Sequence, residues 1–248
     1  MRRFFISKKD IKETEALITG KEAHHLKDVI RLKPGDMFIG FDGSKNQYTC
    51  RVRKVSEGKI EAVIEKKKRQ ESGLLYVTLV CAIPKKAKID DIVQKATELG
   101  VSEIIPIVTE RTIVKIDKRK QEDKIKRWER IALESSKQCG ASAIPKISAI
   151  LDFKDAVKKT RDFGLKIIPC LYERAEPIKE VVAKKKSRKI SILIGPEGDF
   201  TEDEVRFAAS AGYIPVSLGE LVLRVDTACY FSISAVMLLQ RSACSSIG

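Results

Sequence analysis

From residue 74 onward, short apolar runs alternate with segments whose apolar residues recur at helical spacing. The clearest pair is the run 74–83 followed by 88–100, in which the apolar residues share one face and Gly100 marks the end. Alternating strands and helices are typical of a parallel sheet covered on both faces, so the sequence predicts an α/β fold here. Further strands are expected at 103–108, 165–172 and 190–194, and further helices at 152–159, 177–186 and 228–241, besides a charged one that ends near residue 140.

The first 70 residues have a different pattern. Residues 48–55 and 59–65 alternate with a period near two, and 37–41 form another apolar run, so several short strands and a small barrel are expected. A single helix is expected over 23–32. The charged run 66–73 ends in Gly73 and is interpreted as the domain boundary. The sequence therefore predicts two domains, 1–70 and 73–248.

The chain carries a formal net charge of +14, which favours a polyanionic partner such as nucleic acid. Up to residue 72 there are 18 Lys and Arg against 11 Asp and Glu, so the shorter N-terminal part is the denser in positive charge. No apolar run reaches the ~20 residues of a membrane span, and the basic start has too short an apolar part for a secretory signal. We therefore expect a cytoplasmic protein with no membrane partner.

The six cysteines form no CxxC pair, and the two histidines, His24 and His25, are adjacent. This is not the spacing of a zinc site, so no metal is expected and the thiols are expected to be reduced. The sequence also lacks both GxGxxG after the first α/β strand and GxxxxGK[ST], which disfavours a common dinucleotide site and a P-loop.

Two glycine-containing loops flank the last predicted strands. Gly195-Pro196-Glu197-Gly198 follows the run 190–194 and predicts a turn with Pro196 at its second position. Thr201 and Glu204 match a capping box, so a helix should start there and stop at Gly212. The second loop covers residues 217–228. Loops at the carboxyl ends of strands are where α/β proteins bind ligands.

The motifs of these two loops resemble those of a known protein family. The motifs at 194–198, 218–219 and 223–228 resemble those of the RsmE family, the SPOUT-class methyltransferases of small-subunit ribosomal RNA. Residues 3–5, 24–31, 34–36, 94–101 and 138–140 resemble further motifs of that family, in the same order and spacing. The resemblance covers essentially the whole chain.

It implies a PUA-like N-terminal β-barrel, followed by a SPOUT α/β domain with a deep C-terminal trefoil knot. It also implies S-adenosylmethionine as cofactor, a homodimer, and methylation of N3 of a uridine in 16S rRNA of the assembled 30S subunit. The residues implied to bind the cofactor are Leu171, Glu173, Ile194, Gly195, Pro196, Gly198, Leu218, Gly219, Leu223, Thr227 and Ala228. Those implied to contact RNA are Arg2, Arg3, His25 and Arg31. The adenine is expected against Gly195, where a Cβ would fill its slot.

Methylation at N3 removes a proton whose pKa is roughly 9–10, near that of a phenol, and builds charge on O2 and O4. Arg224 is predicted to stabilise this charge. Glu197, Asp226 and Glu173 are alternative bases or orienting groups, and Glu197 is taken with Arg224 as the catalytic pair.

The sequence departs from the common family pattern at three positions. Asp199 stands where a second glycine is usual, Asp226 replaces a glutamate, and Leu221 replaces a first arginine. Aspartate tolerates left-handed backbone, so the turn at Asp199 is expected to survive. Two alternative functions remain: a SPOUT enzyme for another RNA base or tRNA, and a non-catalytic RNA-binding relative.

Overall fold

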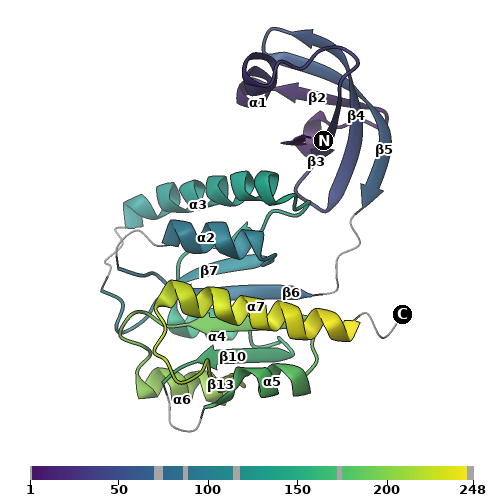
Figure 1. The fold of residues 1–248 in the computed structure, drawn as a ribbon. Coiled ribbons are helices and arrows are strands. Elements are labelled where there is room, and N and C mark those ends of the chain that lie inside the picture. The colour runs from purple at the N-terminus through teal and green to yellow at the C-terminus, as the bar shows by residue number, and fades with distance from the viewer. Residues whose placement is uncertain (1, 70–74, 86–88, 114–117, 172–174, 245–248) are drawn as a thin grey trace. The chain divides into compact units, whose positions relative to one another are not determined.

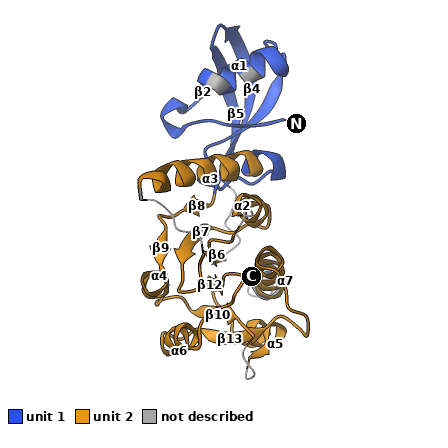
Figure 2. Ribbon diagram, turned by 90° about the vertical axis from the view of Figure 1, so that its left-hand side faces the viewer, with its two compact units in different colours: residues 1–72, 136–144 blue, residues 73–135, 145–248 orange. Residues whose placement is uncertain are grey.

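The computed structural model describes residues 2–69, 75–85, 89–113, 118–171 and 175–244, the side chains of Lys21, His25, Lys118 and 241–244 excepted. It forms two compact units (Figures 1 and 2). The first comprises residues 1–72 and 136–144, and the second residues 73–135 and 145–248. In the described residues, no helix is long and apolar enough to cross a membrane.

The first unit is built on a curved five-stranded sheet that makes half a barrel (Figure 1). Its strand order is β1-β3-β4-β5-β2, with β1 parallel to β3 and the other neighbours antiparallel. The apolar side of each strand packs into one core that contains Phe38 and Leu26. The predicted small β unit is thus confirmed as a half-barrel. The bounds are β1 Arg3–Phe5, β2 Glu15–Thr19, β3 Met37–Phe41, β4 Asn46–Ser56 and β5 Lys59–Arg69.

The helix expected over 23–32 is wrong in its bounds and type. The chain forms α1 (Gly20–His24) and continues as a π-helix, η2 (His25–Val29), after a 3-10 turn η1 (Lys8–Asp10) earlier in the chain. Arg31 then adopts left-handed backbone with a φ of 56°. Left-handed backbone at Arg31 cannot continue a right-handed helix, so the helical segment ends before it.

Two segments have a structure that the sequence did not indicate. Residues 66–69, at the start of the expected domain boundary, are the end of strand β5. Residues 136–144 belong to the first unit although they follow residue 135 of the second. In that segment the Ser142 carbonyl accepts from the Lys45 amide at 2.9 Å, and the Ile144 amide donates to Gly43 at 3.2 Å. Each is a pairing between residues far apart in sequence.

The second unit contains an eight-stranded sheet in which every pair is parallel, as predicted. The order is β11-β13-β10-β12-β6-β7-β8, and β9 also pairs with β7. The bounds are β6 Tyr76–Ala82, β7 Glu103–Val108, β8 Lys146–Ile147, β9 Leu151–Asp152, β10 Leu165–Pro169, β11 Glu176–Pro177, β12 Lys189–Ile194 and β13 Ile214–Ser217.

Helices cover both faces of this sheet. Figure 2 shows α4 and α6 on one face and α2, α5 and α7 on the other. The expected strand 165–172 ends early, at Pro169, and the last helix starts earlier than expected, at Val225. The bounds are α2 Ile89–Glu98, α3 Lys118–Cys139, α4 Phe153–Lys159, α5 Ile178–Lys184, α6 Glu202–Ser210 and α7 Val225–Cys244.

A buried carboxylate joins three elements of this unit. Glu103, the first residue of β7, accepts hydrogen bonds from the Tyr76 hydroxyl at 3.1 Å, the Ser148 hydroxyl at 2.6 Å and the Lys159 ammonium at 2.9 Å. Burial alone would raise the pKa of Glu103, but the hydrogen bonds from Ser148 and Lys159 outweigh it and hold the pKa below its ordinary value. The charged form is therefore the one that stabilises the fold.

We expect Glu103→Gln to lower the free energy of unfolding by about 1–3 kcal/mol at neutral pH, because it leaves buried donors without their charged acceptor. Because the folded-state pKa is depressed, the wild-type advantage is present above the unfolded value near 4.5 and is lost as the pH falls through the folded value. Urea unfolding from neutral to acidic pH measures this difference. The exposed Glu180→Gln serves as control, and a Glu103→Gln deficit that stays constant down to acidic pH contradicts the assignment.

Candidate functional site

The parallel sheet brings five loops to one edge. The loops that follow β6, β7, β10, β12 and β13 all leave the carboxyl ends of their strands. In the strand order, β10 lies between β13 and β12, so the loop at Leu171 lies between the two glycine-containing loops. The sheet topology therefore brings together the motifs that the sequence separates.

The loop after β12 makes a tight turn, in a different register from the one predicted. The Asp199 amide donates to the Pro196 carbonyl at 3.0 Å, so Pro196 is the first residue of the turn and not the second. Asp199 has a φ of 58°, which confirms that aspartate adopts the left-handed backbone here. The capping box is also confirmed, because the Thr201 hydroxyl accepts from the Glu204 amide and the Glu204 carboxylate accepts from the Thr201 amide.

Gly195 is needed for close packing within the loop. Ile194, Gly195 and Pro196 are all buried. A Cβ on Gly195 would meet two ring carbons of Phe200 at 3.1 Å and the Asp199 carboxylate at 3.3 Å. A larger residue at Gly195 would therefore meet Phe200 and Asp199 of the chain itself, and the adenine slot expected here stays a prediction.

Three neighbouring loops hold this turn by hydrogen bonds to or from its residues. Glu197 accepts from the Lys85 amide, after β6, at 2.8 Å. Arg111, after β7, donates to the Gly198 carbonyl at 2.8 Å and more weakly to that of Phe200 at 3.4 Å.

The third connection comes from the residue that departs from the family pattern. One carboxylate oxygen of Asp199 accepts from the Leu171 amide, after β10, at 3.0 Å. The other accepts from the Phe200 amide at 2.8 Å. Asp199 therefore fixes both its own turn and the adjacent loop. Sequence reasoning missed both Lys85 and Arg111. Lys85 acts through its backbone amide, which no side-chain pattern marks, and the only signal for Arg111 was a basic residue soon after a strand.

The second glycine-containing loop leads from β13 into α7. The Gly219 amide donates to the Ser217 hydroxyl at 3.2 Å, and Gly219 has a φ of 123° with open space where a Cβ would stand. Leu218 and Leu223 are half-buried, whereas Leu221 is 78% exposed. This leaves backbone and apolar side chains accessible beside the loop at Leu171.

Arg224 directly precedes α7, and its side chain is exposed. Its carbonyl accepts from the Ala228 amide at 2.8 Å, in the first turn of the helix, while Thr227 is exposed and Ala228 half-buried. Among the residues that the structure describes, none forms a hydrogen bond or ion pair with the Arg224 guanidinium. The group is therefore available to a ligand.

The first turn of α7 is held to the sheet by a pair of buried thiols. The sulfur of Cys229 lies 3.6 Å from that of Cys81 on β6, and neither is exposed. Burial raises the pKa of the Cys229 thiol, so it stays protonated. Both cysteines are free, as predicted, and fill the core beneath the Arg224 turn.

The four predicted RNA contacts differ in their surroundings. Arg2 and Arg31 are exposed, and Arg2 donates to the Ile30 carbonyl at 3.2 Å. Arg3 is turned inward instead: it donates to the Ser142 hydroxyl at 3.2 Å and stacks 5.7 Å from the Phe41 ring centre. Two predicted residues lie outside the described part, the side chain of His25 and all of Glu173.

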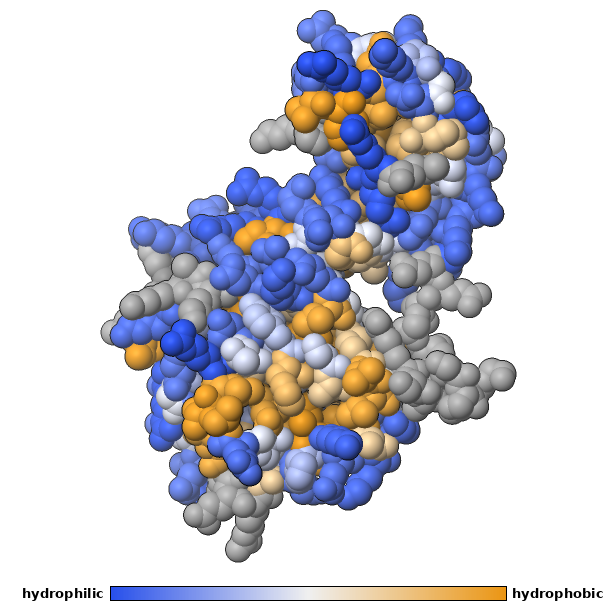
Figure 3. Space-filling model, in the orientation of Figure 1, coloured by the Kyte–Doolittle hydropathy of each residue, from blue (hydrophilic) through white to orange (hydrophobic). Residues whose placement is uncertain are grey.

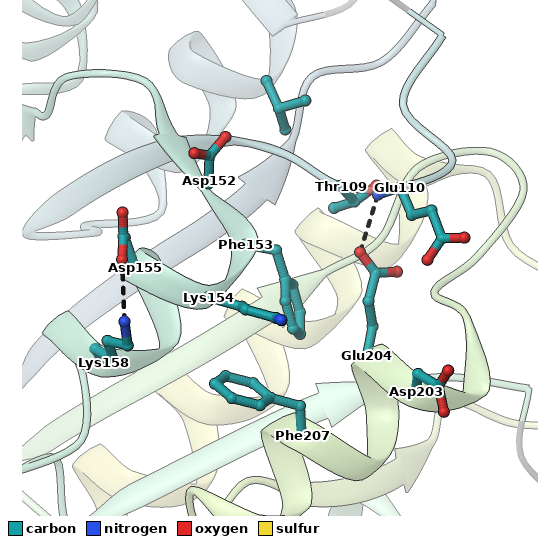
Figure 4. Close-up of a pocket in the computed structure, with 11 residues that line it drawn as sticks. Thr109, Glu110, Asp152, Phe153, Lys154, Asp155, Lys158, Asp203, Glu204 and Phe207 are labelled. Carbon is teal, nitrogen blue, oxygen red and sulfur yellow. Dashed lines mark hydrogen bonds and ion pairs between the residues drawn. The ribbon is translucent and has the colours of Figure 1, made fainter.

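A separate groove of about 710 Å³ lies where β7, α4 and α6 meet. Figure 4 shows its charged lining, in which Glu110, Asp152 and Asp203 stand with Lys154 and Lys158 around Phe153 and Phe207. None of the predicted site residues lines it. No group of three or more potential metal ligands occurs among the described side chains.

The sequence and fold are similar to those of known RNA methyltransferases. Residues 70–237 match the model of an RNA methyltransferase domain, and residues 18–65 match that of an RNA methyltransferase PUA domain. Ribosomal RNA small subunit methyltransferase E of Bacillus subtilis is 31% identical over 95% of this chain and 96% of its own. The protein of that name from Mesomycoplasma hyopneumoniae is 32% identical over 93% of this chain and 96% of its own.

A solved structure extends the similarity to three dimensions. The crystal structure of a ribosomal RNA small subunit methyltransferase E from Neisseria gonorrhoeae, bound to S-adenosyl methionine, superposes with a TM-score of 0.85. The two chains are 29% identical, and the match covers 96% of this chain and 98% of that one.

We expect Asp199→Gly to keep the turn, because glycine adopts a φ of 58° without strain, but to release the Leu171 amide. Loss of one hydrogen bond to a charged acceptor corresponds to roughly tenfold or more faster amide exchange at Leu171. Hydrogen exchange followed by NMR, without any ligand, measures it. Asp199→Asn keeps one acceptor oxygen, so its Leu171 exchange rate should lie between those of the wild type and of Asp199→Gly. An unchanged Leu171 exchange rate would show that the contact contributes nothing.

Proposed function

This chain belongs to the ribosomal RNA small subunit methyltransferase E family, and we propose that it methylates N3 of a specific uridine in 16S rRNA of the assembled 30S subunit. S-adenosylmethionine is the methyl donor, as the family match and the ligand-bound relative support. The observation that carries the proposal is the exposed, unengaged Arg224 guanidinium beside loops that have the motifs of the family. The C-terminal trefoil knot is part of this proposal.

The residues at the loop edge suit such a cofactor. Leu171, Leu218 and Leu223 offer apolar surface for an adenine, and the open space at Gly219 lets a ligand approach the backbone. Glu197 places a carboxylate nearby, which suits a sulfonium cation. When bound, S-adenosylmethionine supplies a methyl group activated by its positive sulfur.

Arg224 stabilises the negative charge that develops on the uracil oxygens as the N3–H bond breaks and the N3–methyl bond forms. The leaving proton passes to a carboxylate, and Glu197, Asp226 and Glu173 are the candidates. Glu197 has one oxygen engaged by the Lys85 amide, which fixes the orientation of the carboxyl group; no described residue bonds to its second oxygen, which is the one proposed to take a proton or ligand.

A homodimer is part of the same proposal. The outer face of α7 carries Phe231 and Leu238, which are 46% and 70% exposed, and the preceding loop adds Leu221 and Val222 at 78% and 75%. Figure 3 shows apolar surface in the region of α7. A large exposed apolar patch on a soluble chain is typical of an interface, and a second copy of the chain is the occupant that the family similarity supports.

Methyl transfer to assembled 30S subunits and to naked 16S rRNA, followed by mass spectrometric mapping of the modified nucleotide, tests the substrate. Transfer to N3 of one uridine in the subunits is expected. Modification of another base or of tRNA would favour a different SPOUT enzyme. Absence of S-adenosylmethionine binding in calorimetry would favour a non-catalytic RNA-binding relative.

Arg224→Ala should lower kcat about 100- to 1000-fold, the effect of removing one group that stabilises a developing oxyanion. The affinity for S-adenosylmethionine, measured by calorimetry, should change little. Arg161→Ala is the control, since Arg161 lies in the turn between α4 and the amino end of β10, at the other edge of the sheet. Wild-type turnover in Arg224→Ala would remove this residue from the mechanism.

The double variant Phe231→Asp, Leu238→Asp should be monomeric, because two charges seven residues apart on one helix face would be buried in the interface. Light scattering should give the mass of two chains for the wild type and of one for the variant. Val29→Asp, in the first unit, is the control for loss of an exposed apolar residue. A variant that remains dimeric would place the interface elsewhere.

A further inference from the structure

Strand β5 ends in a continuous run of four cations. Lys66, Lys67, Lys68 and Arg69 are all exposed and all lie within the strand, which ends at Arg69. These four residues are termed the basic end of β5. Because successive side chains in a strand point to opposite faces, the basic end presents positive charge on both sides of the sheet.

The sheet leaves one edge of this segment unpaired. On one side, the basic end pairs with residues 46–49 of β4. On the other side, the pairing with β2 ends at Val63, so β2 provides no partner for residues 66–69. A ligand could reach the side chains and this strand edge together.

A register shift separates the basic end from the rest of β5. Ile64 is opposite Cys50, and Lys66 is opposite Thr49, so Glu65 is the extra residue of a β-bulge. Beyond the bulge, Lys67 lies over the Tyr48 ring, 5.8 Å from its centre. The cations are thus held on a regular two-stranded support rather than on a loose linker.

The surrounding acidic residues are already paired with other cations. Glu65, next to the run, binds Arg51 at 2.6 Å. Glu61 binds Arg53 at 3.1 Å and Lys59 at 3.0 Å. None of the four residues of the basic end forms an ion pair with a described acidic residue. Among the described residues, no carboxylate therefore compensates these four charges.

Protection of the strand edge against aggregation is the simpler explanation of a lysine there. It does not account for the number or distribution of the charges, since one or two edge lysines already block strand pairing and these four occupy both faces.

We propose that the basic end of β5 binds phosphates of the RNA backbone, as a docking surface distinct from the site that contains Arg224. The inference rests on the proposed RNA substrate. Phosphate contacts of this kind supply affinity and position without reading sequence. Lys66, Lys68 and Arg69 are the expected contacts, whereas the stem of Lys67 is committed to covering Tyr48.

The test compares two variants with the same change in charge. The first is Lys66→Gln, Lys68→Gln, Arg69→Gln. The control is Lys12→Gln, Lys33→Gln, Lys54→Gln, three exposed lysines of the same unit that form no ion pair with a described residue. Binding to a 16S rRNA transcript and to small ribosomal subunits is measured over a range of salt concentrations. Circular dichroism checks that both variants fold.

The first variant should bind at least about tenfold more weakly at ~0.1 M salt, and the slope of log K against log salt should decrease by about two, as expected for three lost phosphate contacts. Its KM for RNA should rise, with kcat at saturating RNA unchanged. Equal binding by the two variants would overturn the proposal, because the effect would then follow net charge alone.

The two proposals can fail separately. A wild type that transfers methyl groups, together with a first variant that binds like the wild type, would refute the docking surface alone. A wild type that transfers none, together with a selective loss of RNA binding in the first variant, would refute the enzymatic function and keep the docking surface.

Discussion

The candidate site depends on hydrogen bonds that hold the turn at residues 195–200 from three sides. A parallel sheet brings the ends of its strands to one edge, but it does not fix the conformation of the loops that leave them. Here Lys85, Arg111 and Leu171 each bond to a residue of the turn across at least 28 positions of sequence. Each bond has a charged donor or acceptor, for which the net contribution is about 1.5–3 kcal/mol, so together the three hold the loop in one orientation.

Asp199 shows how a departure from a family pattern can be compensated. A non-glycine residue in left-handed backbone costs of the order of 1 kcal/mol. The Asp199 carboxylate accepts two backbone amides, and hydrogen bonds to a charged acceptor are stronger than neutral ones. A glycine would avoid the strain but would supply neither bond. The aspartate therefore costs some backbone strain and adds a hydrogen bond to the neighbouring loop.

Local signals in the sequence were enough for much of the fold. The strand at 103–108 and the capping box of Thr201 and Glu204 were predicted as they occur, because both depend on residues close in sequence. The motifs of the site were also recognised, although sequence could not show that Leu171 and Asp199 are bonded. The turn register was missed because proline fits both the first and the second position, and the conformation of Asp199 decides between them.

The features that the sequence did not indicate have a common cause in tertiary pairing. Residues 66–69 are polar and charged, and only the partner strand β4 makes them a strand. Residues 136–144 join the first unit through backbone bonds such as that from Lys45 to Ser142. Arg3 stays a predicted RNA contact, and the same segment provides hydrogen-bond acceptors for its guanidinium, which the sequence did not indicate. Such pairings leave no periodic pattern in the sequence.

The position of Arg224 is unfavourable within the chain itself. It precedes the first turn of the 20-residue helix α7, where the helix dipole is positive and repels a cation. No described side chain compensates the guanidinium charge. An anionic group at this point would be attracted both by Arg224 and by the helix terminus, and in the proposed reaction the uracil that loses its N3 proton is such a group. The proposed function would thus explain why a cation stands where it gains little in the free protein.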